Sequence, residues 1–364
     1  MSNRFCSMLL IFILAFKAAP PAAAQRGEDG LADIIQAIRG ISISGQWFLM
    51  YQRGDLDGEQ FNEFGLKRGY ITIKKRFSSL FAGRITPDIS VDREGDGRGD
   101  LELRLKYCYL QYTLPDLPLL THPYIEFGLV HRPWLDFEEH INNYRVQGTM
   151  YLERIGIMNS ADYGLTLIAL LGGTLDHADA GLYPGRYGSL ALGIYNGGGY
   201  HAIEENAKKS FEGRLTIRPL PEFFPGLQFS YSWALGHGNT AAAPEWDFNA
   251  LFLSAEHRRF VLTAMAFEGN GASSGTLLDA SGRPVHQAGR SAFAEFYFVS
   301  RTLSLFGRID HIRRGGGQRR RFIAGLSYHF LGQCKMLIDI DHEYSPGGDD
   351  IERTVAEFAV EVHY

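Results

Sequence analysis

The sequence predicts an all-β protein, a transmembrane antiparallel β-barrel of sixteen strands that follows a cleaved signal peptide. Three observations predict this fold: an export signal, period-two alternation of apolar and polar residues, and long connections that alternate with short turns. After the signal, no segment approaches the run of about 18 apolar residues that a membrane-spanning helix needs.

Residues 1–24 have the layout of a signal peptide. Arg4 precedes an apolar run over residues 8–16, and residues 22–24 are the small alanines that a signal peptidase requires. The apolar run is shorter than the roughly 20 residues of a membrane-spanning helix. Residues 25–40 are then expected to form a short periplasmic segment, and residues 41–364 the barrel.

Composition and charge exclude several classes of function. The formal net charge is −5, and cleavage of the signal makes it more negative by removing Arg4 and Lys17. Nucleic-acid binding is not expected, because it requires a basic face. Only Cys108 and Cys334 remain after cleavage, so neither a disulfide framework nor a metal–thiolate site is expected, and no cofactor or metal is predicted.

Alternation is clearest in three candidate strands. Residues 68–74 carry apolar side chains at every second position, and the same rule holds for residues 356–364. In the third strand one face is predicted to carry Leu101, Leu103, Leu105 and Tyr107. Such a strand has one apolar and one polar face, which suits both a barrel wall and a soluble sandwich.

The lengths of the connections favour the membrane barrel. The outward connections are predicted to be long and polar: residues 53–64, 92–100, 132–162, 196–206, 237–245, 269–289, 312–319 and 345–352. Most inward connections are predicted to be tight turns, as at residues 78–79 and 256–257. Long outer loops and short periplasmic turns are typical of outer-membrane barrels. Residues 172–186 are the exception, because this inward connection is long.

Three stretches resemble a known family. They are residues 124–134 (YIEFGLVHRPW), residues 153–154 (ER) followed by 159–164 (NSADYG), and residues 193–197 (GIYNG) with 208–219. They are similar to motifs of the phosphate-selective porin O and P family, the sixteen-stranded anion porins of Gram-negative bacteria. The resemblance implies a homotrimer in which a long loop folds into the barrel as a constriction, here residues 132–162.

The predicted constriction loop departs from that family. Family members place lysines on this loop, whereas residues 132–162 contain no lysine. Its charged residues are Arg132, Asp136, Glu138, Glu139, Arg145, Glu153 and Arg154. The resemblance therefore implies a porin without implying selectivity for phosphate.

Alternation also assigns a set of cations to the pore lumen, because a charge facing lipid at the midplane costs about 2–4 kcal/mol. They are Arg68, Lys74, Arg76, Arg84, Arg104, Lys106, Arg214, Arg218 and Arg308. One interpretation is a wall that attracts anions. The other is ordinary pairing with acids such as Glu102, Glu212 and Asp310.

Two further motifs point to partners or chemistry. Residues 313–321 hold five arginines, which suit contact with lipopolysaccharide phosphates or capture of anions. Residues 271–275 match G-x-S-x-G, but a nucleophile elbow needs a helix after the serine, and this segment lies in a Gly/Ser-rich loop. Enzymatic activity is not expected.

The function expected from the sequence is passive diffusion of small hydrophilic solutes or ions, such as inorganic anions, across the outer membrane of a Gram-negative bacterium. Outer-membrane lipid and lipopolysaccharide are the expected surroundings. The alternative is a non-conducting barrel that serves adhesion or envelope structure. A wide lumen is typical of barrels of sixteen or more strands, which favours conduction.

Overall fold

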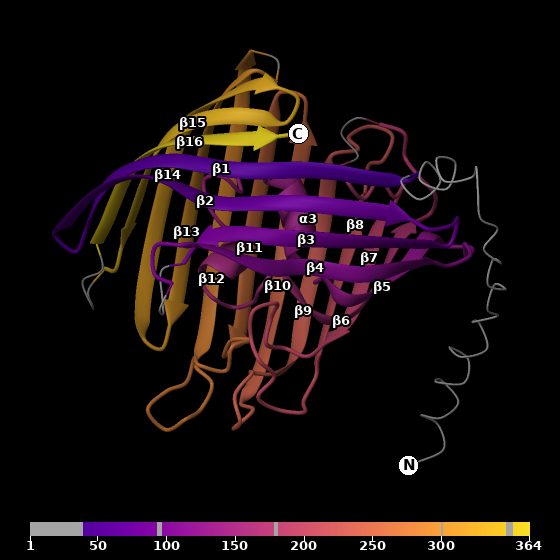
Figure 1. Cartoon of the computed structure of the whole chain (residues 1–364), viewed down its shortest axis with the longest axis horizontal. Helices are drawn as coiled ribbons and strands as arrows, with labels where there is room; N and C mark the ends of the chain where they lie inside the picture. The colour runs from indigo at the N-terminus through magenta and orange to yellow at the C-terminus, as the bar shows by residue number, and fades with distance from the viewer. Residues whose placement is uncertain (1–38, 93–96, 178–180, 300, 347–351) are drawn as a thin grey trace, which may run out of the picture. The chain divides into compact units, whose positions relative to one another are not determined.

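The computed structural model describes residues 39–92, 97–177, 181–299, 301–346 and 352–364. Within these residues sixteen antiparallel strands form a closed barrel, because β1 pairs with β16 (Figure 1). The predicted fold class and strand count are confirmed. The predicted signal peptide, residues 1–24, and nearly all of the predicted periplasmic segment 25–40 lie outside the described residues.

The strands are β1 (Ile41–Leu56), β2 (Glu59–Arg76), β3 (Phe81–Val91), β4 (Leu101–Thr113), β5 (Leu120–His131), β6 (Ala161–Leu171), β7 (Gly188–Tyr195), β8 (Ser210–Ile217), β9 (Leu227–His237), β10 (Glu245–His257), β11 (Phe260–Asn270), β12 (His286–Val299), β13 (Leu303–Arg314), β14 (Gly317–Leu331), β15 (Cys334–Tyr344) and β16 (Glu352–His363). Two short helices, α3 (Leu135–Ile141) and α4 (Tyr151–Arg154), lie between β5 and β6. No helix in the described ranges is long and apolar enough to cross a membrane.

The two faces of the wall have opposite character. On β13 Arg308 and Asp310 are buried in the barrel interior, whereas Leu305 and Ile309 are exposed outside. β16 follows the predicted alternation, with Glu357 buried and its neighbour Phe358 exposed. Charged groups inside and apolar groups outside is the arrangement that a lipid environment requires.

Two predicted outer loops are in fact hairpins. β1 and β2 pair from Ile41↔Lys75 to Leu56↔Glu59, and only Asp57 and Gly58 connect them. Both connecting residues have positive φ, 54° and 87°, as a two-residue turn of this kind requires. Gly315 and Gly316 connect β13 and β14 in the same way, with φ of 55° and 90°. The predicted loops 53–64 and 312–319 were therefore wrong, because Asp-Gly and Gly-Gly favour tight turns.

One predicted face was also wrong. Tyr107 was expected beside Leu105 on the same face, but Tyr107 is buried inside while Leu105 is exposed outside. The register of β3 and β4 passes from Thr86↔Tyr107 to Pro87↔Leu105, which leaves Lys106 as the extra residue of a β-bulge. The bulge reverses the alternation, so Lys106 and Tyr107 both point into the barrel.

The structure confirms that the inward connection after β6 is long. Residues 172–187 join β6 to β7, with an isolated bridge between Thr174 and Gly185. The strand count around it was nevertheless correct, because β6 and β7 pair from Gly164↔Tyr195 to Leu171↔Gly188. This connection contributes to the lumen.

Candidate functional site: the barrel lumen

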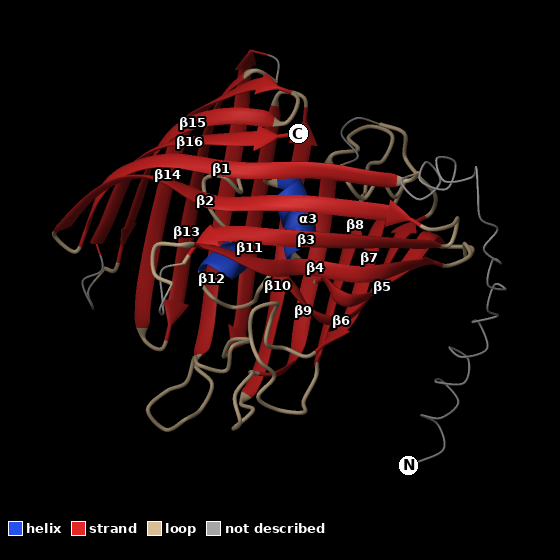
Figure 2. Cartoon of the chain, in the orientation of Figure 1, coloured by secondary structure: helices blue, strands red, loops and turns tan. Residues whose placement is uncertain are grey.

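The segment between β5 and β6 lies inside the barrel. Figure 2 shows its helices within the ring of strands, and their apolar side chains pack against inward-facing residues of β9 to β13. The Trp134 ring meets Phe252 of β10 edge-on at 5.0 Å, and the Tyr151 ring meets Phe267 of β11 at 5.6 Å. An apolar core therefore joins the two helices to β9, β10, β11 and β13. A second apolar cluster joins Tyr144 and Val146 of the segment to inward residues of β1, β2 and β12 to β16.

Local contacts give the segment its shape. The backbone amide of Arg132 donates to the carbonyl of Ser160 at 3.2 Å, which closes the neck between the two strands. The indole Nε1 of Trp134 donates to the Glu138 carboxylate at 2.9 Å, one helical turn away. Both Trp134 and Glu138 are buried, so this bond fixes the start of α3.

Ionic and polar bonds anchor the segment to the wall at both ends. The Arg132 guanidinium donates two bonds to Glu212 of β8, and both side chains are buried. At the far end the Arg154 guanidinium lies 3.4 Å from Asp310 of β13. Breaking a buried pair of the Arg132–Glu212 kind leaves an uncompensated charge and costs about 3–5 kcal/mol.

Hydrogen bonds to three separate strands hold the middle of the segment. The Tyr144 hydroxyl donates to Glu295 of β12 at 2.6 Å. The amino group of Lys67 on β2 donates to the Gln147 carbonyl at 2.8 Å, and that of Lys335 on β15 donates to a carbonyl of the same segment, that of Asn143. Contacts from β2, β12 and β15 therefore hold the segment across the barrel rather than along one strand.

The inward connection 172–187 meets the segment from the other end. The Tyr183 hydroxyl donates to Asp136 of α3 at 2.6 Å. The Arg214 guanidinium of β8 lies over the rings of Phe137, at 4.1 Å, and Tyr183, at 4.9 Å. The outer connection between β5 and β6 and the inner connection between β6 and β7 thus together fill the lumen beside β6 to β10.

Two carboxyl groups of α3 have shifted pKa values in opposite directions. Burial raises the pKa of Glu138 to about 7, although Arg308 and the Trp134 indole counteract it. For Asp136 burial also raises the pKa, but His131, His140 and the Tyr183 hydroxyl outweigh it and bring the pKa below its usual value. Asp136 is therefore a permanent anion, whereas Glu138 titrates near neutral pH.

The predicted lumen cations fall into three groups. The first group pairs with acids: Arg68 lies 2.7 Å from Asp88, Arg104 lies 3.6 Å from the same carboxylate, and Arg308 lies 2.9 Å from Asp310. These three cations match the pairing interpretation of the sequence.

The second group braces the wall and its connections. Arg214 donates to the Pro133 carbonyl at 2.9 Å and to the hydroxyl of Ser189 at 2.8 Å. Arg218, just beyond β8, donates to the backbone carbonyls of Gly185 and Pro225. Both guanidiniums are buried against backbone.

The third group lines a polar space of about 710 Å³ between α3 and the wall of β1 to β4. Lys74, Arg84 and Lys106 contribute to its lining. In the part of the chain that the structure describes, neither Lys74 nor Lys106 forms an ion pair. Arg76, two residues beyond Lys74, is exposed at the inner end of β2.

Most acids of the segment are compensated locally. Arg145 lies 3.0 Å from Glu139 and 3.6 Å from Glu153, so one guanidinium serves both carboxylates. Asp136 faces His131 and His140 at 3.6 and 3.7 Å. Arg145 and its two carboxylates therefore keep one net negative charge, whereas the wall contributes the three cations Lys74, Arg84 and Lys106 to the polar space.

Some lumen residues were missed in the sequence. Lys67 is the extra residue of a second bulge, where the register passes from Phe48↔Arg68 to Leu49↔Leu66, and simple alternation hides it. Lys335 and Glu361, an interior pair at 3.1 Å, do follow the alternation and could have been found from it. Tyr183 gives no signal, because its connection has no regular period.

Comparisons with known proteins support the fold. No family model and no curated protein sequence matches the chain. Among solved structures, OmpF of Salmonella typhi aligns with a TM-score of 0.59 at 12% identity, covering 88% of this chain and 97% of that one. DcaP, an outer membrane channel of Acinetobacter baumannii, aligns with a TM-score of 0.57 at 9% identity, covering 89% and 97%. OmpTdeltaL8, a loop-deletion mutant of an outer membrane protein of Vibrio cholerae, aligns with a TM-score of 0.59 at 10% identity, covering 89% and 100%. The chain therefore has the fold of the outer-membrane barrels of Gram-negative bacteria.

Proposed function

We propose that the protein is an outer-membrane porin, a passive channel for small hydrophilic solutes with a preference for anions. The observation that carries this proposal is the polar space beside α3, with Lys74 and Lys106 in its lining. A channel needs a polar interior, and unpaired cations on its wall favour anions.

In the proposed mechanism residues 132–162 form the constriction. Their helices pack mainly on the apolar inner wall of β10 and β11, and Tyr144 and Val146 reach the second apolar cluster. Solutes then pass beside β1 to β4, where tyrosines such as Tyr70 and cations such as Lys106 lie close together: the Lys106 amino group is 4.7 Å from the Tyr70 ring centre. The Tyr107 ring lies 5.5 Å from the same amino group, and Lys106 is 4% exposed, so its charge acts on the lumen through the positive potential of the wall.

The resemblance to the phosphate-selective porins and the sixteen-stranded fold suggest a homotrimer of such barrels. The absence of lysine from residues 132–162 argues against the phosphate specificity of that family. We therefore propose a general anion preference.

Single-channel recording in a planar bilayer under a salt gradient tests the proposal. The wild-type barrel is expected to give discrete steps and an anion-biased reversal potential, and Lys74→Gln with Lys106→Gln is expected to move that potential toward cations. Lys208→Gln with Lys209→Gln is the matched control, because both lysines are exposed in the connection between β7 and β8. A folded barrel without conductance would favour the adhesive or structural alternative, and a cation-biased wild type would refute the anion preference.

A further inference from the structure

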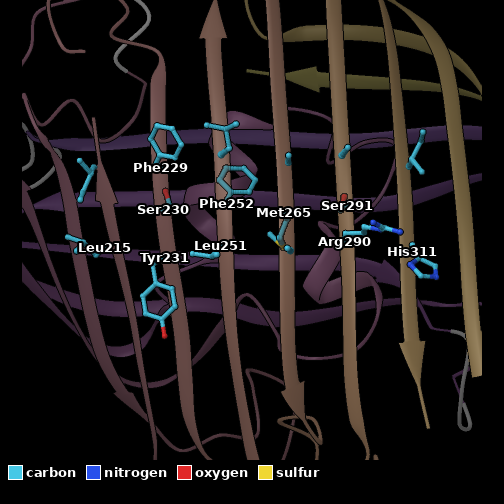
Figure 3. A pocket seen from close by; sticks show the side chains of 16 residues that line it. Leu215, Phe229, Ser230, Tyr231, Leu251, Phe252, Met265, Arg290, Ser291 and His311 are labelled. Atoms are coloured by element: carbon cyan, nitrogen blue, oxygen red, sulfur yellow. The ribbon is translucent and has the colours of Figure 1, made fainter. Parts of the chain in front are cut away.

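The outer wall of the barrel has an apolar hollow over β8 to β13. Its volume is about 700 Å³, and Leu215, Phe229, Leu251, Leu253 and Ile309 contribute to its lining. Its floor is low because Ala264, Ala266 and Ala292 point outward there. Figure 3 shows Arg290 and His311 together at one edge, with Arg290 reaching toward His311.

These two residues belong to a row that crosses three strands. Arg290 of β12 is the register partner of His311 of β13, which in turn partners Arg320 of β14. Arg290 and Arg320 are exposed on the outer face, and Arg313 lies one outward position further toward the loops. We call Arg290, His311 and Arg320 the cationic row, after its two arginines.

Among the residues that the structure describes, the cationic row has no partner of opposite charge. Over the described ranges neither Arg290 nor Arg320 forms an ion pair, and His311 contacts Gln318 at 3.4 Å. By contrast Arg319 and Arg321, which point inward beside Arg320, both pair with carboxylates. The outward acids nearest in register are Glu268, which partners Ala288, and Glu352, which lies across Tyr344 from Arg320. Neither acid is the direct register partner of a residue in the row.

The row marks the edge of the apolar belt. From the row toward the inner turns of the barrel, every outward-facing residue of these three strands is apolar or aromatic. They are Ala292, Ala294, Phe296 and Phe298 on β12, Leu303, Leu305, Gly307 and Ile309 on β13, and Phe322, Ala324, Leu326, Tyr328 and Phe330 on β14. The row itself lies nearer the end of the barrel that carries the long connection before β12 and the short turn between β13 and β14. It therefore lies at the level of the outer-leaflet headgroups.

Charge and shape together identify an occupant. Phosphate groups pair well with arginine, and apolar chains fill an apolar hollow. We propose that the cationic row and the hollow form a binding site for a phosphate-bearing lipid of the outer leaflet, with its phosphate on Arg290 and Arg320 and an acyl chain in the hollow. This site is independent of conduction, because all of its proposed contacts lie on the outside of the wall.

The test is native mass spectrometry of the folded full-length barrel in detergent, with purified lipopolysaccharide as the probe. Wild type is expected to hold the lipid, and Arg290→Gln with Arg320→Gln to weaken binding by about tenfold or more, because two charge-assisted contacts are lost. The matched control, Arg258→Gln with Arg259→Gln, removes the same charge at the inner turn between β10 and β11 and is expected to bind as wild type does.

A second variant tests the contribution of the acyl chain to binding separately from that of the phosphate headgroup. Ala264→Phe, whose register partner is Ala292 and not Arg290, fills the hollow from the lipid side and is expected to weaken lipid binding while both arginines remain. Displacement of the lipid by inorganic phosphate would assign the row to free anions and overturn the proposal. Equal loss of lipid in the control, no lipid on wild type, or dissociation of a multimer by the arginine substitutions would also overturn it.

Discussion

The inner walls of β2 to β4 and of β9 to β11 differ although both belong to one barrel. On β10 the inward side chains are Trp246, Phe248, Ala250 and Phe252, all buried under residues 132–162. On β2 and β3 the inward positions include Lys74, Arg84 and Thr86, which line the polar space. The barrel is thus lined by two kinds of surface, one covered and one free for water.

This difference shows how the sequence of a strand indicates whether its lumen face is covered. β10 carries apolar residues on both faces, since Leu251 and Leu253 are exposed to the outside. Contact with lipid explains why the outward face of β10 is apolar. The inward face is also apolar, so another part of the protein must cover it. Apolar residues on both faces of a barrel strand therefore indicate where an inserted loop packs.

The largest effect is expected on the covered side. Trp134→Ala removes the ring that packs on Phe252 and the donor to Glu138, which should destabilise the packing of residues 132–162 by about 3–5 kcal/mol. The loosened segment should become a protease target, and single-channel currents should fluctuate. Limited proteolysis with mass-spectrometric mapping of the cut sites checks this outcome.

The control is Trp233→Ala on the outward face of β9, beside Gly213. It removes the same ring without touching the segment, so residues 132–162 should stay protected. If both variants were cut equally, the loss of barrel stability would explain the cleavage, and the covered side would have no special role.

A smaller effect depends on pH. Between pH 4.5 and 7 the folded protein keeps a proton on Glu138 that the unfolded chain has released, so stability falls as the pH rises through that window. Glu138→Gln should remove this loss and raise the free energy of unfolding by up to about 3 kcal/mol at pH 8, with no gain at pH 4. Urea unfolding at both pH values measures the difference. An equal gain at pH 4 and pH 8 would assign the effect to packing.

The smallest effect concerns the contact between the two connections. Tyr183→Phe deletes the donor to Asp136, which keeps its two histidine neighbours, so the expected loss is about 1 kcal/mol. Hydrogen exchange of the α3 amides should quicken about fivefold. Tyr231→Phe, which deletes a similar bond to Asn249 on the lipid-facing side, should leave α3 unchanged. Unchanged exchange in Tyr183→Phe would show that the inward connection does not hold α3.

The sequence predicts the strands of the barrel wall better than it predicts the contacts of residues 132–162 inside the barrel. The strand count and the faces of β16 follow from period two, because one residue per step faces each side. The face of Tyr107 does not follow, because the bulge at Lys106 is set by pairing with β3. The contacts of residues 132–162 could not be predicted, since Arg132 and Glu212 meet only when the barrel brings β5 and β8 together around the segment.

The pairing of β1 with β16 has a consequence for how the molecule forms. Gln46 and His363 face each other across a separation of 317 positions, and their strands close the barrel. Bringing such distant segments together has a high entropic cost and slows folding. Until β16 arrives, β1 presents an open hydrogen-bonding edge that invites pairing with other chains. The free edge of β1 therefore has to be protected until β16 pairs with it, and that protection is as much a requirement of this fold as the finished wall.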